Sequence, residues 1–379
     1  MTVSSLWNTV CLVWPMDNGA VTAEERALCV RVATGKGAMT SGLAAAARRH
    51  RLHLLIAAGL SDLERQTDVG RSLLRDLTVA AALDAWHEEA LRHLLDALGA
   101  ADIPALLLKG TGLAYTIYPA AHLRPRLDVD VLIRRDMLDR AEAVLVACGW
   151  VRPAERDSEL AEPQRHYVKR GPGVTLYHLD LHWKVASPRL FADALTFDEL
   201  ESRAVDIAGL GRFARTPGPV DALFHACLHR VAHHADAIEL LWVWDIHLLM
   251  ERLTTEDTER FIALAERTGM RAVCGRGLQL ASDLFGTSGS LEAATRLLVS
   301  SGAPEPSSRF LRGLRPITML ETDLMTLPWR DRVHLIGDHL FPSSAYMRAR
   351  YPRWPTVLLP LAYVARIAHG APRWFRRDN

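Results

Sequence analysis

The stretch Leu127-Asp-Val-Asp-Val-Leu-Ile133 decides the fold, because two carboxylates interrupt an otherwise apolar strand at a spacing of two. In an extended strand, residues i and i+2 face the same side and lie roughly 7 Å apart. Asp128 and Asp130 are therefore expected to project together, with Val129 and Val131 in the core. Such carboxylates repel each other unless cations neutralise them, and paired Mg²⁺ ions do so in phosphoryl chemistry. The stretch predicts a metal-binding strand, and the open alternative is an edge strand with a solvated acidic face.

A second polar strand is predicted at Tyr177-His-Leu-Asp-Leu-His-Trp183. Its alternation places His178, Asp180 and His182 on one face. If this strand pairs with the first, Asp180 completes a hard oxygen site suited to Mg²⁺ or Mn²⁺. Taken alone, the same pattern fits an ordinary polar sheet surface.

A glycine-rich segment, Leu107-Leu-Lys-Gly-Thr-Gly112, ends the strand that comes before these two. Glycine lets backbone N–H groups approach a phosphate closely. Lys109 is one of only four lysines in the chain, which hints at a specific contact. A plain strand-to-helix connection explains the segment equally well.

The hydrophobic periodicity around these segments predicts an α+β protein with three regions. Residues 1–102 and 217–379 show helical spacing, and the second of these is expected to form a helical bundle with a basic tail. Residues 103–216 show short apolar runs and one helix, which predicts a small mixed sheet with helices packed on it. The strands are expected at residues 105–108, 127–133, 166–169 and 174–183, and the helix at residues 136–148.

The composition does not indicate a nucleic-acid-binding, membrane-spanning or disulfide-rich protein. The 379 residues carry a net charge of +1, which gives no overall field to attract nucleic acid or membrane. Five cysteines lie far apart in the sequence, so neither a disulfide framework nor a zinc knuckle is indicated and a cytoplasmic location is expected. The longest apolar run, residues 355–365, is too short for a membrane span, and the apolar stretch at residues 10–16 is interpreted as mature protein.

Three histidines, His225, His229 and His233, recur every four residues and form one stripe along a predicted helix. Such a stripe could bind a metal, and with His234, Asp236 and Asp245 nearby it suggests a helical metal-dependent phosphohydrolase. The blander interpretation is a set of buried, hydrogen-bonded histidines or a polar seam facing a cleft.

Five short motifs occur in an order that identifies a family resemblance: Leu108-Lys-Gly110, Tyr118, Arg124-Pro125, Asp128-Val-Asp130 and Asp180-Leu-His-Trp183. In this order and spacing, the chain resembles the uncharacterised nucleotidyltransferase family of the DNA polymerase β-like superfamily. The resemblance covers about residues 83–249, including the histidine-bearing helix at 223–229 and the stretch at 242–245.

The resemblance implies a minimal nucleotidyltransferase core in which Gly110 and Thr111 form the turn that holds the triphosphate. It implies that Asp128 and Asp130 bind both metal ions, and that Asp180 binds the catalytic ion and helps to deprotonate the acceptor hydroxyl. Arg124 would contact phosphate or brace the turn. Thr111 departs mildly from the Gly or Ser usual in the superfamily. Three further residues are expected to line the nucleotide site: Lys109, His182 and His229.

The expected activity is therefore Mg²⁺- or Mn²⁺-dependent transfer of a nucleoside monophosphate from an NTP, such as ATP, to a hydroxyl acceptor, with release of pyrophosphate. A degenerate, non-catalytic protein that binds nucleotide or a partner is one alternative, and the phosphohydrolase is the other. The acceptor stays open among RNA, a protein, a peptide and a small molecule. Which NTP is used and the oligomeric state are open as well.

Overall fold

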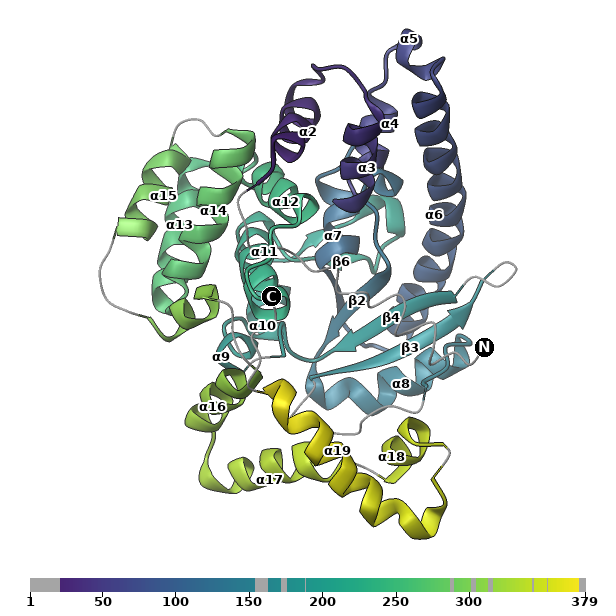
Figure 1. Ribbon diagram of the computed structural model, residues 1–379, viewed down its shortest axis with the longest axis vertical. Helices are drawn as coiled ribbons and strands as arrows, with labels where there is room; N and C mark the ends of the chain where they lie inside the picture. Colours follow the sequence, from purple (N-terminus) through teal and green to yellow (C-terminus); the bar gives the residue numbers. More distant parts are fainter. Residues whose placement is uncertain are drawn as a thin grey trace.

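A four-stranded mixed sheet lies at the centre of the fold (Figure 1). The strand order is β1-β2-β4-β3, in which β2 and β4 run parallel and both outer strands run antiparallel to their neighbours. A second sheet contains two short strands, β5 and β6. The bounds are β1 Ala105–Leu108, β2 Asp128–Ile133, β3 Gln164–Arg170, β4 Leu176–His182, β5 Val205–Asp206 and β6 Arg215–Thr216.

The computed structural model describes residues 21–153, 163–171, 176–187, 189–286, 290–300, 305–312, 316–342, 344–352 and 354–374. The apolar stretch at residues 10–16 lies outside this part of the chain. The predicted α+β class with helical flanks is confirmed, and the four predicted strands occur with ends that differ by one or two residues.

One face of the central sheet is covered by α6 (Asp68–Ala100) and α8 (Leu138–Ala147). Val129 and Val131 of β2 and Leu179 and Leu181 of β4 point into this core and are fully buried. In each strand, the residues between them point to the other face, as the period of two requires. The carboxylate-bearing side chains therefore lie on the face away from α6.

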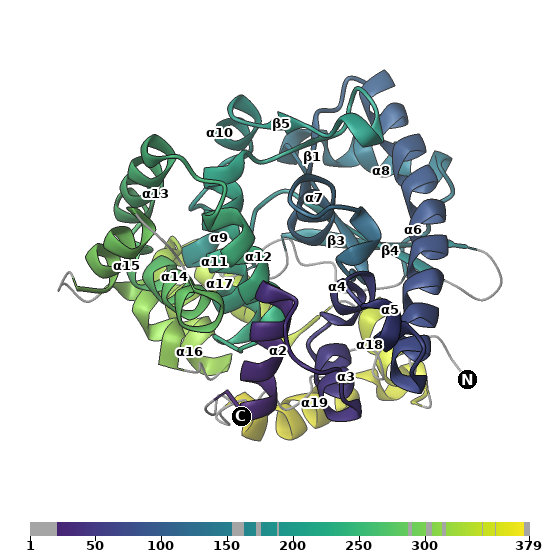
Figure 2. The same ribbon diagram turned by 90° about the horizontal axis from the view of Figure 1, so that it is seen from above.

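The opposite face looks toward α7 (Lys109–Thr116) and the helical C-terminal half, in which α11 (Pro219–His234) packs on α12 (Leu240–Met250) and α14 (Arg271–Phe285). Figure 2 shows the strands lying between α6 and α11. Pro219 stands at the first position of α11, where its missing N–H costs no helical hydrogen bond. The carboxylate face of the sheet is thus turned toward α7 and the helices that follow the sheet in the sequence.

The chain before the sheet supplies the first helices, and caps explain where they begin. Thr22 and Glu25 form a capping box ahead of α2, and Ser61 and Glu64 form another ahead of α5. These helices are α2 Ala23–Thr34, α3 Ser41–Arg49, α4 His53–Ala58 and α5 Asp62–Arg65.

The remaining helices follow β4. They are α9 Arg189–Ala192, α10 Phe197–Ser202, α13 Thr255–Arg267, α15 Ser290–Ser300, α16 Pro316–Thr326, α17 Trp329–Leu340, α18 Ser344–Arg350 and α19 Leu359–Trp374. The 3₁₀ turns are η1 Ala121–Leu123, η2 Arg135–Met137, η3 Ala208–Leu210, η4 Pro306–Arg312 and η5 Thr356–Leu358. Helices α16 to α19 gather at the bottom of Figure 1.

The predicted boundaries at residues 102 and 216 stay predictions. Helices from the first and third predicted regions share one apolar core, in which Leu28 and Leu52 join Phe224, Leu241 and Leu278.

Within the described chain, no helix combines the length and apolar character needed to cross a membrane. The four described cysteines, Cys29, Cys148, Cys227 and Cys274, are buried and free of disulfides.

Candidate metal centre and nucleotide site

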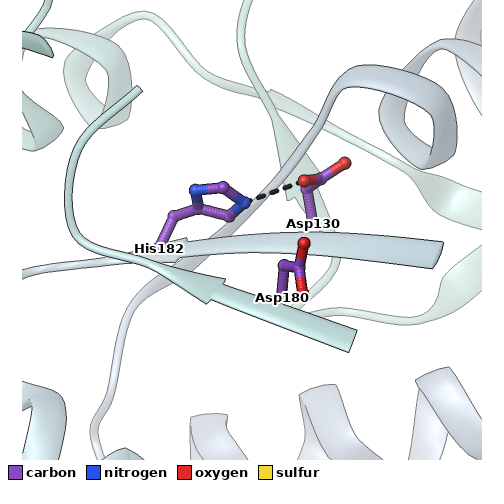
Figure 3. Close-up of side chains that lie close together, drawn as sticks. All are labelled: Asp130, Asp180 and His182. Atoms are coloured by element: carbon purple, nitrogen blue, oxygen red, sulfur yellow. Dashed lines mark hydrogen bonds and ion pairs between the residues drawn. The ribbon is translucent and has the colours of Figure 1, made fainter. Parts of the chain in front are cut away.

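Two aspartates meet at the middle of the sheet because β2 and β4 pair in register. Asp130 lies opposite Asp180 in the parallel ladder, and both side chains point to the same face. With His182 they form a group whose possible ligand atoms all lie within 4.8 Å of one another (Figure 3). Among the residues that the structure describes, this is the only such group of three histidines, cysteines or carboxylates.

Asp130 is the most enclosed carboxylate of the site, with 4% of its surface exposed. Its Oδ1 accepts from the Lys109 ammonium at 2.6 Å and lies 2.8 Å from Nε2 of His182. Burial opposes ionisation, but the charge of Lys109 and the contact with His182 outweigh it and hold the pKa of Asp130 well below its usual range. Asp130 is therefore ionised, and Lys109 neutralises it.

Asp180 is held by two side chains of the neighbouring strand β3. His166, which lies opposite Asp180 in the ladder, places Nδ1 at 2.7 Å from Oδ1, and Gln164 donates to Oδ2 at 3.0 Å. The His166 ring also stacks on His178. These contacts fix the direction of the Asp180 carboxylate.

Asp128 lies half-buried at the start of β2, on the same face of the strand. Burial and the negative charges of Asp130 and Asp180 raise the pKa of Asp128 to about 7, against the opposing charges of Lys109 and Arg51. It is outside the group of three possible ligands, in which His182 takes the third place. Metal binding by Asp128 therefore stays a prediction.

The glycine-rich segment passes directly from β1 into α7, and the helix begins at Lys109. Lys109 itself turns the chain with a φ of +46°. A Cβ on Gly110 would lie 2.5 Å from Nη1 of Arg124, and a Cβ on Gly112 would lie 2.6 Å from the Leu107 carbonyl oxygen. Both positions therefore require glycine for close packing.

Thr111, which the sequence places in the triphosphate turn, is 1% exposed. Its Oγ1 is buried without a hydrogen-bond partner in the described structure. A hydroxyl left in this state is costly, which makes it a candidate to contact a ligand or water.

Arg124 forms a buried ion pair with Asp245. Its Nε and Nη2 donate to Asp245 of α12 at 2.9 and 2.6 Å, and the Tyr118 hydroxyl donates to the same carboxylate at 2.6 Å. The remaining nitrogen, Nη1, faces Gly110. This geometry is that of a brace for the turn, and a phosphate contact by Arg124 stays a prediction.

The histidine stripe of α11 faces the carboxylate side of the sheet. Burial, followed by the positive charge of Lys109, lowers the pKa of His225 to about 4 and the pKa values of His229 and His233 well below their usual range. His225 places Nε2 at 3.0 Å from the Val185 carbonyl oxygen. The stripe forms no three-ligand group in the described part of the chain.

Sequence reasoning missed three residues of this region: Gln164, His166 and Arg51. The Arg51 guanidinium pairs with Glu239 and lies 5.6 Å from the centre of the Trp242 ring. Arg51 lies in the turn between α3 and α4, which is distant in sequence from the strands of the central sheet. Only the alternation of β3 could have pointed to Gln164 and His166.

A divalent cation fits the donor set at the sheet. Two carboxylates and an imidazole approach one another, and Nδ1 of His182 is buried without a partner among the described residues. Carboxylate oxygens suit Mg²⁺ and Mn²⁺, and an imidazole favours Mn²⁺ of the two. Asp130, Asp180 and His182 are the residues that would hold the ion.

A comparison with protein families agrees with this geometry. The model of a family described as uncharacterised nucleotidyltransferase matches residues 38–286, about two thirds of the chain. This match runs from the start of α3 to the end of α14 and includes the sheet, the glycine turn and the histidine stripe. No curated protein matches the sequence. The chain therefore belongs to the uncharacterised nucleotidyltransferase family.

Proposed function

We propose that the protein transfers a nucleoside monophosphate from an NTP to a hydroxyl acceptor and releases pyrophosphate. The observation that carries the proposal is the pairing of Asp130 with Asp180 on parallel strands, next to His182 and the glycine turn. All three carboxylates expected of an active enzyme are present, which argues against a degenerate, non-catalytic protein. Mg²⁺ or Mn²⁺ is the proposed cofactor.

The residues around the glycine turn are proposed to bind the triphosphate of the NTP. The backbone N–H groups at the start of α7, at Gly110 and Thr111, are proposed to hold the triphosphate, since a helix N-terminus attracts anions. Lys109 adds positive charge beside them, with His182 and His229 as further lining groups. The bound cations would neutralise charge on the entering and leaving oxygens of the α-phosphate.

The proposed role of Asp180 is to hold the catalytic ion and to receive the proton of the acceptor hydroxyl. Its contacts with His166 and Gln164 support this role, because they fix one orientation of the carboxylate. Asp128 and Asp130 are proposed as the shared metal ligands. Asp130, which contacts Lys109 in this structure, would hold a metal ion when one is bound.

The test incubates the purified protein with each α-labelled NTP, Mg²⁺ or Mn²⁺ and a cell extract. It then asks which macromolecule or metabolite gains label while pyrophosphate is released. Three variants, Asp128→Ala, Asp130→Asn and Asp180→Asn, are expected to lose labelling by at least a hundredfold, because loss of a charged group that acts in the transition state costs about 3 kcal/mol or more.

Asp136→Asn is the matched control. It removes an exposed carboxylate from the turn directly after β2 and leaves the metal group intact. Equal labelling by the wild type and the Asp130→Asn and Asp180→Asn variants would show that these carboxylates do not carry the reaction.

A further inference from the structure

Arg51 occupies an unusual backbone position just after α3. Its φ is +56°, in the left-handed region that residues other than glycine seldom adopt. The N–H of Arg51 donates to the Arg48 carbonyl at 3.1 Å, and the N–H of Leu52 donates to the Ala47 carbonyl at 2.8 Å. This pair of hydrogen bonds forms a helix ending in which glycine usually takes the left-handed position. An arginine is unfavourable there, which points to a use for its side chain.

The turn at Arg51 is anchored to the start of α12. Nε2 of His50 lies 2.8 Å from Oε1 of Glu25, and the Leu240 N–H donates to Nδ1 of the same ring at 3.4 Å. Nε of Arg51 donates to Glu239, the residue directly before α12 and 188 positions away in the sequence. These contacts fix the position of the turn and the direction of the Arg51 side chain.

The terminal nitrogens of the Arg51 guanidinium are available to a ligand. Glu239 contacts Nε, whereas Nη1 and Nη2 reach the surface and have no partner among the described residues. The side chain is 28% exposed. The Trp242 ring lies against the guanidinium, with its centre 5.6 Å from Cζ, and helps to hold it in place. A guanidinium held in this way can donate two parallel hydrogen bonds to a phosphate group.

One stripe of side chains on α12 connects Arg51 with the glycine turn. Three residues at the start of this helix recur at intervals of three and therefore share a face: Glu239, Trp242 and Asp245. Arg51 contacts the first two, and Arg124, whose Nη1 faces Gly110, pairs with the third. Three residues of an α-helix rise by about 4.5 Å. The Arg51 guanidinium thus lies about one helical turn from the ion pair that braces the glycine turn.

The histidine stripe of α11 meets the same side chains. The His234 and Trp242 rings have centroids 4.1 Å apart, and the His229 ring lies edge-on to Trp242 with centroids 6.0 Å apart. Burial raises the pKa of Asp128, and the charge of Arg51 opposes this rise. Arg51 therefore lies on the side of the sheet that carries the carboxylates.

We propose that Arg51 binds the triphosphate of the nucleotide, with Nη1 and Nη2 donating to phosphate oxygens of the pyrophosphate portion. The inference rests on the proposed nucleotidyl transfer, and it adds a residue of the N-terminal helices to the nucleotide site. The charge of Arg51 stabilises the negative charge that develops on the departing pyrophosphate. Glu239 and Trp242 orient the guanidinium for this contact.

The binding test uses tripolyphosphate, which has the phosphate chain of an NTP and no nucleoside, so it does not depend on which base the protein prefers. It is titrated calorimetrically, at saturating Mn²⁺, into the wild type, Arg51→Gln and Arg49→Gln. Arg49 is the matched control, because it ends the same helix, is 45% exposed and pairs with Glu25 at 3.0 Å. Arg51→Gln is expected to bind at least tenfold more weakly than the wild type, and Arg49→Gln within twofold of it.

Two further variants separate phosphate binding from a merely structural role. Arg51→Gly removes the guanidinium and suits the left-handed backbone, so its expected tenfold loss of affinity does not come from a strained turn. Glu239→Gln removes the ion pair and keeps the guanidinium, so its affinity is expected to fall less than threefold. Equal losses for Arg51→Gln and Glu239→Gln overturn the proposal, as does a wild type that does not bind tripolyphosphate.

A labelling arm separates this inference from the proposed function. The wild type and Arg51→Gln are compared over a range of concentrations of the NTP that labels an acceptor. A KM for the NTP that rises at least tenfold in Arg51→Gln supports both proposals. Transfer with an unchanged KM supports nucleotidyl transfer but overturns the role of Arg51. Tripolyphosphate binding that depends on Arg51, without transfer of label from any NTP, supports phosphate binding by Arg51 and refutes the proposed transfer.

Discussion

The buried pair of Arg124 and Asp245 allows a quantitative prediction about what holds the glycine turn in place. The guanidinium contacts both carboxylate oxygens, and the two side chains are 7% and 3% exposed. Asp245→Asn keeps the size of the side chain and removes its charge, so Arg124 is left as a buried cation without a counter-charge. Loss of one partner from such a pair costs about 3–5 kcal/mol. We therefore expect the free energy of unfolding to fall by this amount.

The assay is urea unfolding followed by circular dichroism, with the m-value checked for two-state behaviour. Asp68→Asn provides the control, because Asp68 pairs with Arg71 on the exposed side of α6 at 97% exposure. An exposed pair of this kind contributes at most about 1 kcal/mol. A loss of less than 1 kcal/mol for Asp245→Asn would refute the reasoning.

A double-mutant cycle isolates the interaction itself. The Arg124→Met and Asp245→Leu substitutions are each expected to cost several kcal/mol, and the double variant is expected to cost much less than their sum, since no unpaired charge remains. Additive losses would show that the pair does not stabilise the fold through charge compensation. Because Nη1 of Arg124 packs against Gly110, each single variant is also expected to raise the KM for the NTP.

Three further predictions follow from the same region. Gly110→Ala is expected to lower stability by about 1–3 kcal/mol in thermal unfolding, because its Cβ would lie 2.5 Å from Nη1 of Arg124, whereas Gly209→Ala has open space and should cost less than 1 kcal/mol. His182→Gln is expected to weaken Mn²⁺ binding about 10- to 100-fold by calorimetry, and unchanged affinity would remove this residue from the metal group. His225 has a folded pKa of about 4, below the unfolded value of 6.5, so the unfolded chain binds the proton first and stability falls as the pH drops through this window. Urea unfolding should show a loss of about 2 kcal/mol from this group between pH 7.5 and pH 5, and an equal pH dependence in His225→Gln would contradict it.

The sheet was predictable from the sequence because its signal is local. Alternation along residues 127–133 and 177–183 encodes which side chains share a face, whatever the strands pair with. The prediction that Asp180 joins the aspartates of the first strand needed one assumption, that the two strands are neighbours. The parallel direction and the register that set Asp130 opposite Asp180 came only from the structure. The helical regions on either side of the sheet were predictable in the same way, from the helical spacing of their apolar residues.

The partners of the carboxylates were not predictable, because they depend on register and on contacts between distant segments. His166 reaches Asp180 only because β3 pairs with β4 in one particular register. Arg124 meets Asp245 across 121 residues, and no local pattern distinguishes such an arginine from one that binds phosphate. The resemblance allowed both roles for Arg124, and the geometry of the ion pair favours the bracing role.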